Sequence, residues 1–181
     1  KDKDLVKVIG RLSQNIKYIF EKTREGTAIH SLKEELQLIN NYISIQEIRF
    51  KYSFNYKGPS QNIIAEYGNI MIPILQLQIH VENAIEHGLS NRLNSTYVEI
   101  KITEEDDSFL FQVIDDGVGR PMAKEIGSQG TQEGTKMIAE IHTIFNAQNN
   151  RKITQWYSDN CFGDYGTIVN IRIPKNFDYE I

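Results

Sequence analysis

The stretch from Val81 to Gly88, VENAIEHG, holds the residues whose types and spacing best suit chemistry. Asn83 offers an amide oxygen, a hard ligand of the kind that Mg²⁺ uses together with waters and phosphate oxygens. His87 follows four residues later, so a helix would place both side chains on one face. With Glu82 beside them, this stretch is predicted to present polar groups to a ligand.

Two glycine-containing segments could complete such a site. Asp115, Gly117 and Gly119 follow directly on an apolar run, and more glycines recur from Gly127 to Gly134. Glycines after a strand let the backbone approach a ligand closely, and exposed amides there suit phosphate. A carboxylate at a strand end can accept a hydrogen bond from a base amino group. Each pattern alone also suits an ordinary turn.

The elements that would position these residues follow from periodicity. A helix is expected from about Ile72 to Gly88, with Pro73 at its first position and Gly88 closing its last turn. Its apolar face is formed by residues three and four apart: Ile74, Leu77, Val81, Ala84 and Ile85.

Two amphipathic helices are expected before residue 49. The first covers residues 4–21, and Ser31 with Glu34 forms a capping box that opens the second. The second has an apolar stripe of Leu32, Leu36, Ile39 and Ile43. The two helices could pack as an antiparallel hairpin, or their stripes could face a partner chain.

Beyond residue 49 the alternation of apolar and polar residues favours strands, and we place a domain boundary there. The expected strands are 50–56, 98–102, 109–113, 152–157 and 167–174, and the expected helices are 72–88 and 135–145, with 63–67 ambiguous. The strand near 109–114 is apolar on both faces and is therefore expected to be central. This order predicts a two-layer α/β sandwich with a mixed, mostly antiparallel sheet.

Composition excludes several classes of protein. The chain has 181 residues, a net charge of −4 and one cysteine, Cys161. The charge provides no basic footprint for nucleic acid. A single cysteine excludes an internal disulfide and a Cys-rich zinc site. No run of apolar residues is long enough to span a membrane, so no direct membrane contact is expected.

Together these motifs resemble the ATP-binding catalytic region of two-component sensor histidine kinases, in particular the LytS/YesM-like group. Leu32–Phe50 is similar to the linker of that group, Pro73–Gly88 to its N box, and Val113–Gly119 to its first glycine box. Gly163–Pro174 resembles its final G-x-G-T…P strand, with one extra residue between the glycines. The resemblance implies a Bergerat-type sandwich, the fold shared by histidine kinases, gyrase, MutL proteins and a chaperone family.

The resemblance also implies roles for individual residues, with ATP and Mg²⁺ as cofactors. Asn83 matches the residue that binds Mg²⁺, and Glu82 matches an acid that orients or activates groups at the γ-phosphate. His87 matches a residue near the phosphates, and Asp115 matches the reader of the adenine amino group. The remaining matches are Gly117 and Gly119 in the first glycine box, Gly134 and Lys136 in the second, Thr167 near adenine, and Arg120 to Thr135 as the mobile lid.

Three positions depart from the pattern of that group. Glu86 stands where a Lys is usual, Lys136 replaces a glycine, and Ala139 replaces an Asn. Two hypotheses follow. One is an active kinase region, and the other is a degenerate module with weak or no nucleotide binding that acts through protein contacts. A chaperone or MutL relative fits the linker pattern less well.

The acceptor His of the group lies in a Pro-His-Phe segment that does not occur here. His30, His80 and His142 lack that context and are expected to be structural or surface residues. We therefore expect a fragment that lacks the phosphoacceptor, with residues 1–48 as the rest of the dimerisation helices and linker and 49–181 as the ATP-binding domain. The implied partners are a response regulator and a second copy, in the cytoplasmic portion of a membrane-bound bacterial sensor.

Overall fold

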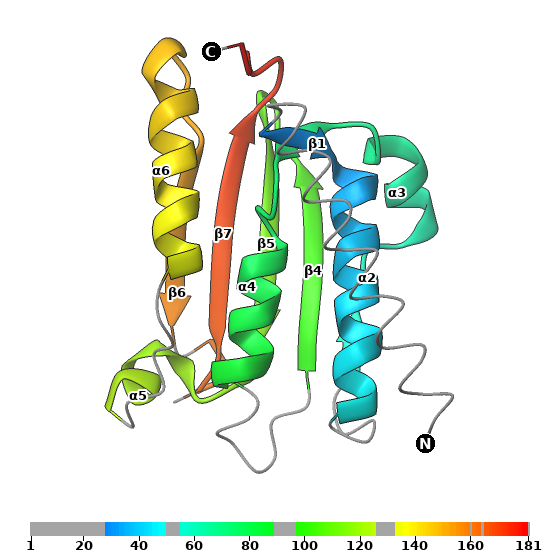
Figure 1. The fold of residues 1–181 in the computed structure, drawn as a ribbon, viewed down its shortest axis with the longest axis vertical. Coiled ribbons are helices and arrows are strands. Elements are labelled where there is room, and N and C mark those ends of the chain that lie inside the picture. Colours follow the sequence, from blue (N-terminus) through cyan, green and yellow to red (C-terminus); the bar gives the residue numbers. More distant parts are fainter. Residues whose placement is uncertain are drawn as a thin grey trace.

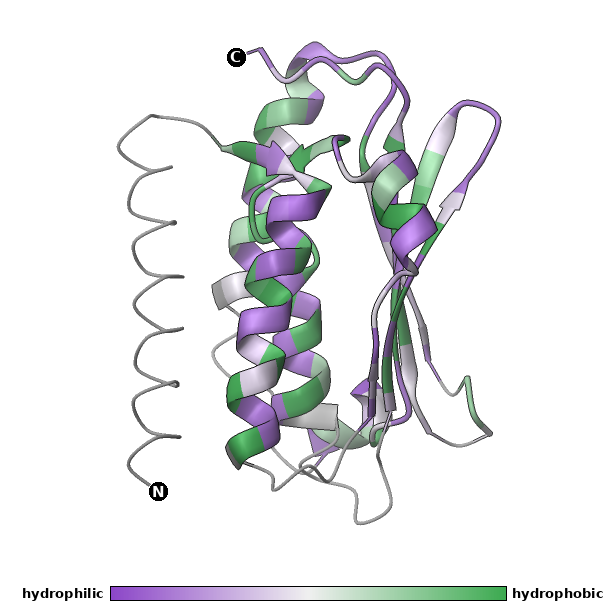
Figure 2. Ribbon diagram, turned by 90° about the vertical axis from the view of Figure 1, so that its right-hand side faces the viewer, coloured by the Kyte–Doolittle hydropathy of each residue, from purple (hydrophilic) through white to green (hydrophobic). Residues whose placement is uncertain are grey.

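The computed structural model describes residues 28–49, 55–88, 97–125, 133–159, 161–163 and 165–180. In these ranges the molecule has two layers, with helices α2, α4 and α6 on one face of a five-stranded sheet (Figure 1; Figure 2). The predicted helix at 4–21 and most of the predicted strand at 50–56 lie outside the described residues. None of the described helices is long and apolar enough to cross a membrane.

The sheet has the strand order β2-β4-β5-β7-β6. Its strands are β2 (Asn55–Lys57), β4 (Tyr97–Glu104), β5 (Ser108–Asp115), β6 (Thr154–Asp159) and β7 (Thr167–Pro174). Strand β2 runs parallel to β4, and the other neighbours are antiparallel. The mixed, mostly antiparallel sheet is thus confirmed, as is the central position of β5.

The helices are α2 (Leu32–Arg49), α3 (Gln61–Tyr67), α4 (Gln78–Asn83), α5 (Gly119–Glu125) and α6 (Glu133–Gln148), and a π-helical segment, η1 (Ala84–Gly88), continues α4. Strands β1 (Ile29–Ser31) and β3 (Met71–Pro73) form a separate antiparallel ribbon. Helix α3 resolves the stretch around 63–67 that the sequence left ambiguous.

The capping box at the start of α2 is confirmed. The Ser31 amide donates to Oε2 of Glu34 over 2.8 Å, and the Glu34 amide donates to Oγ of Ser31 over 3.3 Å. The apolar stripe of α2 is buried in the same core as Phe111 and Ile171 of the sheet. Helix α2 therefore packs on the sheet, and the boundary near residue 49 stays a prediction.

The predicted start of the central helix was wrong. Met71–Pro73 is a strand because β1 offers it an antiparallel partner, with Ile29 opposite Pro73. Leu75 then adopts a positive φ of 59°, which interrupts any helix. The helix begins only at Gln78. Pro73 thus ends a strand and does not open the helix.

The residues directly after the first glycine box form a helix that the sequence did not predict. Gly119–Glu125 forms the short helix α5. Pro121 lies in its first turn, where its missing N–H costs no intrahelical hydrogen bond. The region that resembles the mobile lid therefore begins with a helix at the end of β5.

Candidate functional site

A cavity of about 610 Å³ lies between α4, α5, α6 and the adjoining ends of β5, β6 and β7. It brings together five of the predicted site residues, which are far apart in the sequence: Asn83, Asp115, Gly119, Lys136 and Thr167. The other lining residues are His80, Ala84, Arg120, Pro121, Ala123, Lys124, Thr135, Ala139, Tyr157, Asp159 and Val169.

Asp115 is the buried carboxylate of this cavity. It ends β5 opposite Thr167 of β7, and its side chain is 6% exposed. One oxygen, Oδ1, accepts a hydrogen bond from the Gly117 amide over 2.8 Å. Burial raises the pKa of Asp115 to about 7, although hydrogen bonds from the backbone of Gly117 and Thr167 oppose this shift. The hydrogen bond from Gly117 thus holds the carboxylate in place, and Asp115 lines the cavity.

Asn83 and Glu82 end helix α4, but only one of them lines the cavity. Asn83 is exposed and lines it. Glu82 is not among the lining residues, and its Oε1 accepts a hydrogen bond from Nε2 of Gln78 over 2.8 Å. Burial raises the pKa of Glu82, and the negative charges of Glu86 and Glu35 raise it further. The catalytic role of Glu82 stays a prediction.

The π-helical segment η1 follows Asn83 immediately. A π-helix has a wider repeat than an α-helix and often marks a functional site. The simple four-residue spacing assumed for Asn83 and His87 therefore does not apply here. The side chain of His87 lies outside the described residues. Glu86 is exposed, as expected for a carboxylate that must stay away from phosphates.

The predicted glycines have different positions. Gly119 has a φ of 75° at the turn from β5 into α5 and lines the cavity. Gly117 supplies the amide that binds Asp115. Gly134 is not among the lining residues. A Cβ there would lie 3.2 Å from Cγ2 of Ile79, so this glycine allows α6 to pack closely on α4.

Sequence reasoning missed the polar residues that β6 contributes. The guanidinium carbon of Arg120 lies 4.0 Å from the centre of the Tyr157 ring, and Nε of Arg120 lies 3.3 Å from Oδ1 of Asp159. These contacts connect α5 to β6, and all three residues line the cavity. Arg120 directly follows the first glycine box, which could have drawn attention to it, whereas β6 showed only a strand pattern.

His80 and His142 are buried and face glutamines. Nε2 of His80 lies 3.1 Å from Oε1 of Gln155, and Nε2 of His142 lies 2.6 Å from Oε1 of Gln76. Burial lowers the pKa of each imidazole to about 4. Both side chains are therefore neutral near pH 7. His80 also lines the cavity, which the sequence did not indicate.

We expect His142→Gln to reduce the pH dependence of stability in mild acid. Unfolded His142 takes up a proton below its ordinary pKa of 6.5, whereas the folded side chain does so only near 4. The stabilising effect is therefore present above pH 6.5 and is lost as the pH falls toward 4. Urea unfolding at several pH values should show a slope lower by about 1.4 kcal/mol per pH unit in the variant. An unchanged slope would contradict the buried neutral imidazole.

The fold is that of solved histidine kinase domains. The structure matches the histidine kinase domain of the blue-light activated kinase from Erythrobacter litoralis EL346 with a TM-score of 0.57, 17% identity, and 92% of this chain and 74% of that chain covered. It matches the catalytic domain of histidine kinase ThkA with a TM-score of 0.51, 17% identity, and 81% and 95% covered. The chain has the fold of histidine kinase catalytic domains, and the expected Bergerat-type sandwich is confirmed.

Sequence comparison identifies nearer relatives. The family model for histidine kinases matches residues 1–54 of this chain. The sensor histidine kinase/phosphatase LytS of Staphylococcus aureus strain MRSA252 is 27% identical over 112 residues, which cover 61% of this chain and 18% of LytS. The resemblance to LytS-like sensor histidine kinases is thereby confirmed. The chain spans under a fifth of the length of these curated relatives.

Proposed function

We propose that this chain is the ATP-binding catalytic region of a sensor histidine kinase, which binds Mg-ATP and transfers the γ-phosphate to a His on an upstream segment. One observation carries the proposal: Asn83, Asp115 and Thr167, from α4, β5 and β7, line a single cavity in the fold of histidine kinase catalytic domains.

The cavity suits a nucleotide in size and polarity. Its volume of about 610 Å³ lies within the usual range of small-molecule sites. Asp115 and Thr167 lie next to each other, and the ionised carboxylate can accept a hydrogen bond from the adenine amino group. Arg120, Lys124 and Lys136 line the same cavity and supply positive charge for phosphates.

The residues present also fit Mg²⁺ that arrives with the nucleotide. The described residues contain no group of three or more His, Cys, Asp or Glu that could bind a metal ion. Mg²⁺ commonly takes one or two protein ligands together with phosphate oxygens and waters. Asn83 would supply the amide oxygen, and the ion would neutralise charge on the phosphates. In phosphoryl transfer the protein acts mainly through such positioning and charge neutralisation.

The alternative is a degenerate module that acts through protein contacts, as Glu86, Lys136 and Ala139 suggest. The geometry favours the active kinase region. Glu86 is exposed, so water screens its charge. Lys136 and Ala139 both line the cavity, where a lysine can contact phosphate and an alanine leaves room. Phosphotransfer to the acceptor His in the intact protein distinguishes the two.

The intact protein would act in a two-component system. ThkA has been solved in complex with the response regulator TrrA, and that kinase matches this chain with a TM-score of 0.50, 18% identity, and 95% of this chain and 49% of that chain covered. By analogy, we propose a response regulator as partner. Dimerisation through residues 1–48 and a place in the cytoplasmic portion of a membrane-bound sensor are part of the same proposal.

The first test is calorimetric titration with ADP and a non-hydrolysable ATP analogue, with and without Mg²⁺. Wild type is expected to bind both nucleotides more tightly with Mg²⁺. Asn83→Ala should remove most of this Mg²⁺ effect, because the amide oxygen is lost, and should leave adenosine binding unchanged. Asn62→Ala, on the exposed face of α3, is the matched control. A folded protein that binds no nucleotide at millimolar concentration would refute the active kinase in favour of the degenerate module.

A further inference from the structure

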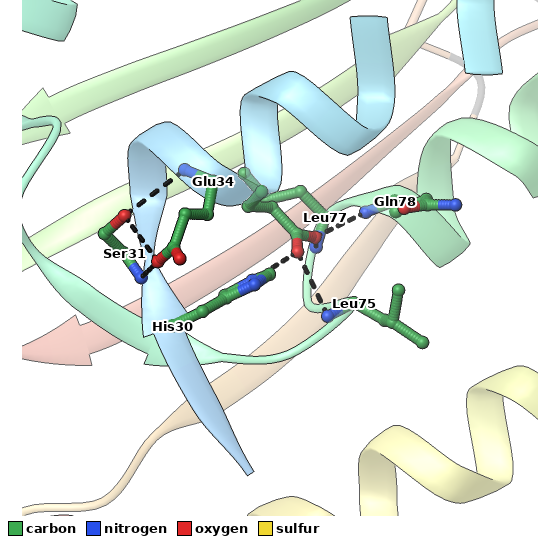
Figure 3. Close-up of polar contacts among 7 residues, drawn as sticks. His30, Ser31, Glu34, Leu75, Leu77 and Gln78 are labelled. Carbon is green, nitrogen blue, oxygen red and sulfur yellow. Dashed lines mark hydrogen bonds and ion pairs between the residues drawn. The ribbon is translucent and has the colours of Figure 1, made fainter. Parts of the chain in front are cut away.

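Glu35 of α2 binds the start of α4 through a fully buried carboxylate. The residues whose amides it binds, Leu75, Leu77 and Gln78, are labelled in Figure 3. Its Oε1 accepts hydrogen bonds from the amides of Leu77 over 2.7 Å and Gln78 over 2.8 Å. Its Oε2 accepts one from the Leu75 amide over 3.0 Å and lies 2.6 Å from Nε2 of His30. One side chain thus satisfies three backbone donors at the beginning of the helix that carries Asn83.

Helix α4 does not provide this cap from its own sequence. Its N-cap residue is Leu77, whose side chain accepts no capping hydrogen bond. Leu75, two residues earlier, has the positive φ of 59° that a leucine rarely adopts. Such a backbone persists only where surrounding contacts hold it. The start of α4 therefore depends on Glu35, which lies 42 positions away from Leu77 in the chain.

The contact extends from Glu35 to the predicted site residues. Gln78, whose amide binds Glu35, donates from its side chain to Glu82. Asn83 is the next residue and the last of α4. At the rise of an α-helix, Gln78 and Asn83 are separated by only about 7.5 Å along the axis. Asn83 therefore lies within two turns of the capped end, in the same short helix.

We propose that Glu35 is a positioning residue for the nucleotide site: through its carboxylate, α2 sets the position of α4 and hence the placement of Asn83 for a Mg-nucleotide. The inference deepens the proposed function and rests on it. Helix α2 also forms most of the linker that precedes the sheet. A shift of α2 relative to the sheet is thus expected to alter Mg-nucleotide affinity through this carboxylate.

The test compares Glu35→Gln with Glu34→Gln, the same chemical change at adjacent positions. An amide at position 35 has one acceptor oxygen, so the amides of Leu75, Leu77 and Gln78 cannot all keep their bonds. A glutamine side chain at position 34 can still serve in the capping box with Ser31. Hydrogen exchange of residues 75–83 is measured in both variants and in wild type, followed by titration with Mg-ADP and with adenosine.

Glu35→Gln is expected to speed exchange at residues 75–83 about tenfold relative to Glu34→Gln, as the loss of a hydrogen bond to a charged group would produce. Mg-ADP affinity should fall about tenfold by the same reasoning. Adenosine affinity should stay unchanged, because it depends on Asp115 and not on Asn83. A role confined to fold support would lower both affinities or neither.

Equal exchange in the two variants, or a parallel loss of Mg-ADP and adenosine affinity, would overturn the proposal. If wild type binds neither ligand, the proposed function fails, while the exchange comparison still decides whether Glu35 holds α4. Should Glu35→Gln not fold, Glu35→Asp keeps the charge but is too short to reach all three amides. The same exchange and affinity criteria then apply to Glu35→Asp.

Discussion

Asp115→Asn is expected to lower the affinity for ADP and for adenosine about 100-fold. The substitution removes a hydrogen bond to a charged acceptor, and it leaves the NH₂ of the asparagine side chain facing the adenine amino group, which is also a donor. Asp115 lines the cavity beside Thr167, where the ionised carboxylate would accept the adenine amino group. In the variant, the side-chain oxygen of the asparagine can still accept the hydrogen bond from the Gly117 amide. The side-chain NH₂ then points toward the adenine amino group. Calorimetric titration of both ligands measures the loss.

The matched control is Asp116→Asn, one residue further on. Asp116 accepts the Tyr97 amide through Oδ1 over 2.9 Å and is not among the cavity-lining residues. Its substitution should leave both affinities within about twofold, because an Asn oxygen can replace the acceptor. Wild-type affinity in Asp115→Asn would refute this residue as the adenine reader.

The same carboxyl predicts a pH dependence of binding. Burial raises the pKa of Asp115 to about 7. The ionised form is the better acceptor, so affinity in wild type should rise with pH up to about 7 and then level off. The unliganded fold holds this proton more tightly than the unfolded chain, so the effect on stability has the opposite sign. At pH 8 the unliganded Asp115→Asn protein is expected to unfold at a higher urea concentration than wild type. A loss of ligand affinity in this variant would then not be caused by unfolding.

Gly166→Ala is expected to destabilise the fold by about 3 kcal/mol, from a left-handed backbone and an added clash. Gly166 has a φ of 81° just before β7. A Cβ there would lie 2.6 Å from the backbone oxygen of Asp115 and 2.6 Å from Cδ2 of Phe162. Because Asp115 belongs to the cavity, the clash should also weaken nucleotide binding.

Gly163→Ala separates the two causes. Gly163 has nearly the same φ, 80°, but a Cβ there would meet nothing within 4 Å. Only the backbone penalty remains, so we expect a loss of about 1 kcal/mol. Urea unfolding curves with equal m-values compare the two variants with wild type. Equal losses at both positions would mean that the close approach at Gly166 has no energetic consequence.

Much of the fold could be predicted from local pattern. The alternation over 98–102 and 109–113 predicted the hairpin of β4 and β5, and the residues 167–174 predicted β7 with its observed bounds. Such patterns suffice because a strand buried on one or both faces must repeat its apolar residues every two positions. The capping box at Ser31 is equally local, since its two partners are three residues apart.

The candidate site was only partly predictable. Asn83 and Asp115 stood out because their residue types and neighbours form recognisable boxes. Tyr157 and Asp159 did not, because alternation along a strand shows which residues share a face but not which ligand that face meets. Their part in the cavity depends on where α5 and Arg120 pack against β6.

By itself the sequence determined the layers of this protein, the central strand and the residue types available to the proposed nucleotide site. Only the tertiary structure decided where helix α4 begins. Local pattern extended the helix back to Ile72, but β1 pairs with β3, and Glu35 caps the chain at Leu77 and Gln78. Backbone amides at a helix start need acceptors, and here the acceptor comes from a distant helix, so periodicity within the segment could not reveal it.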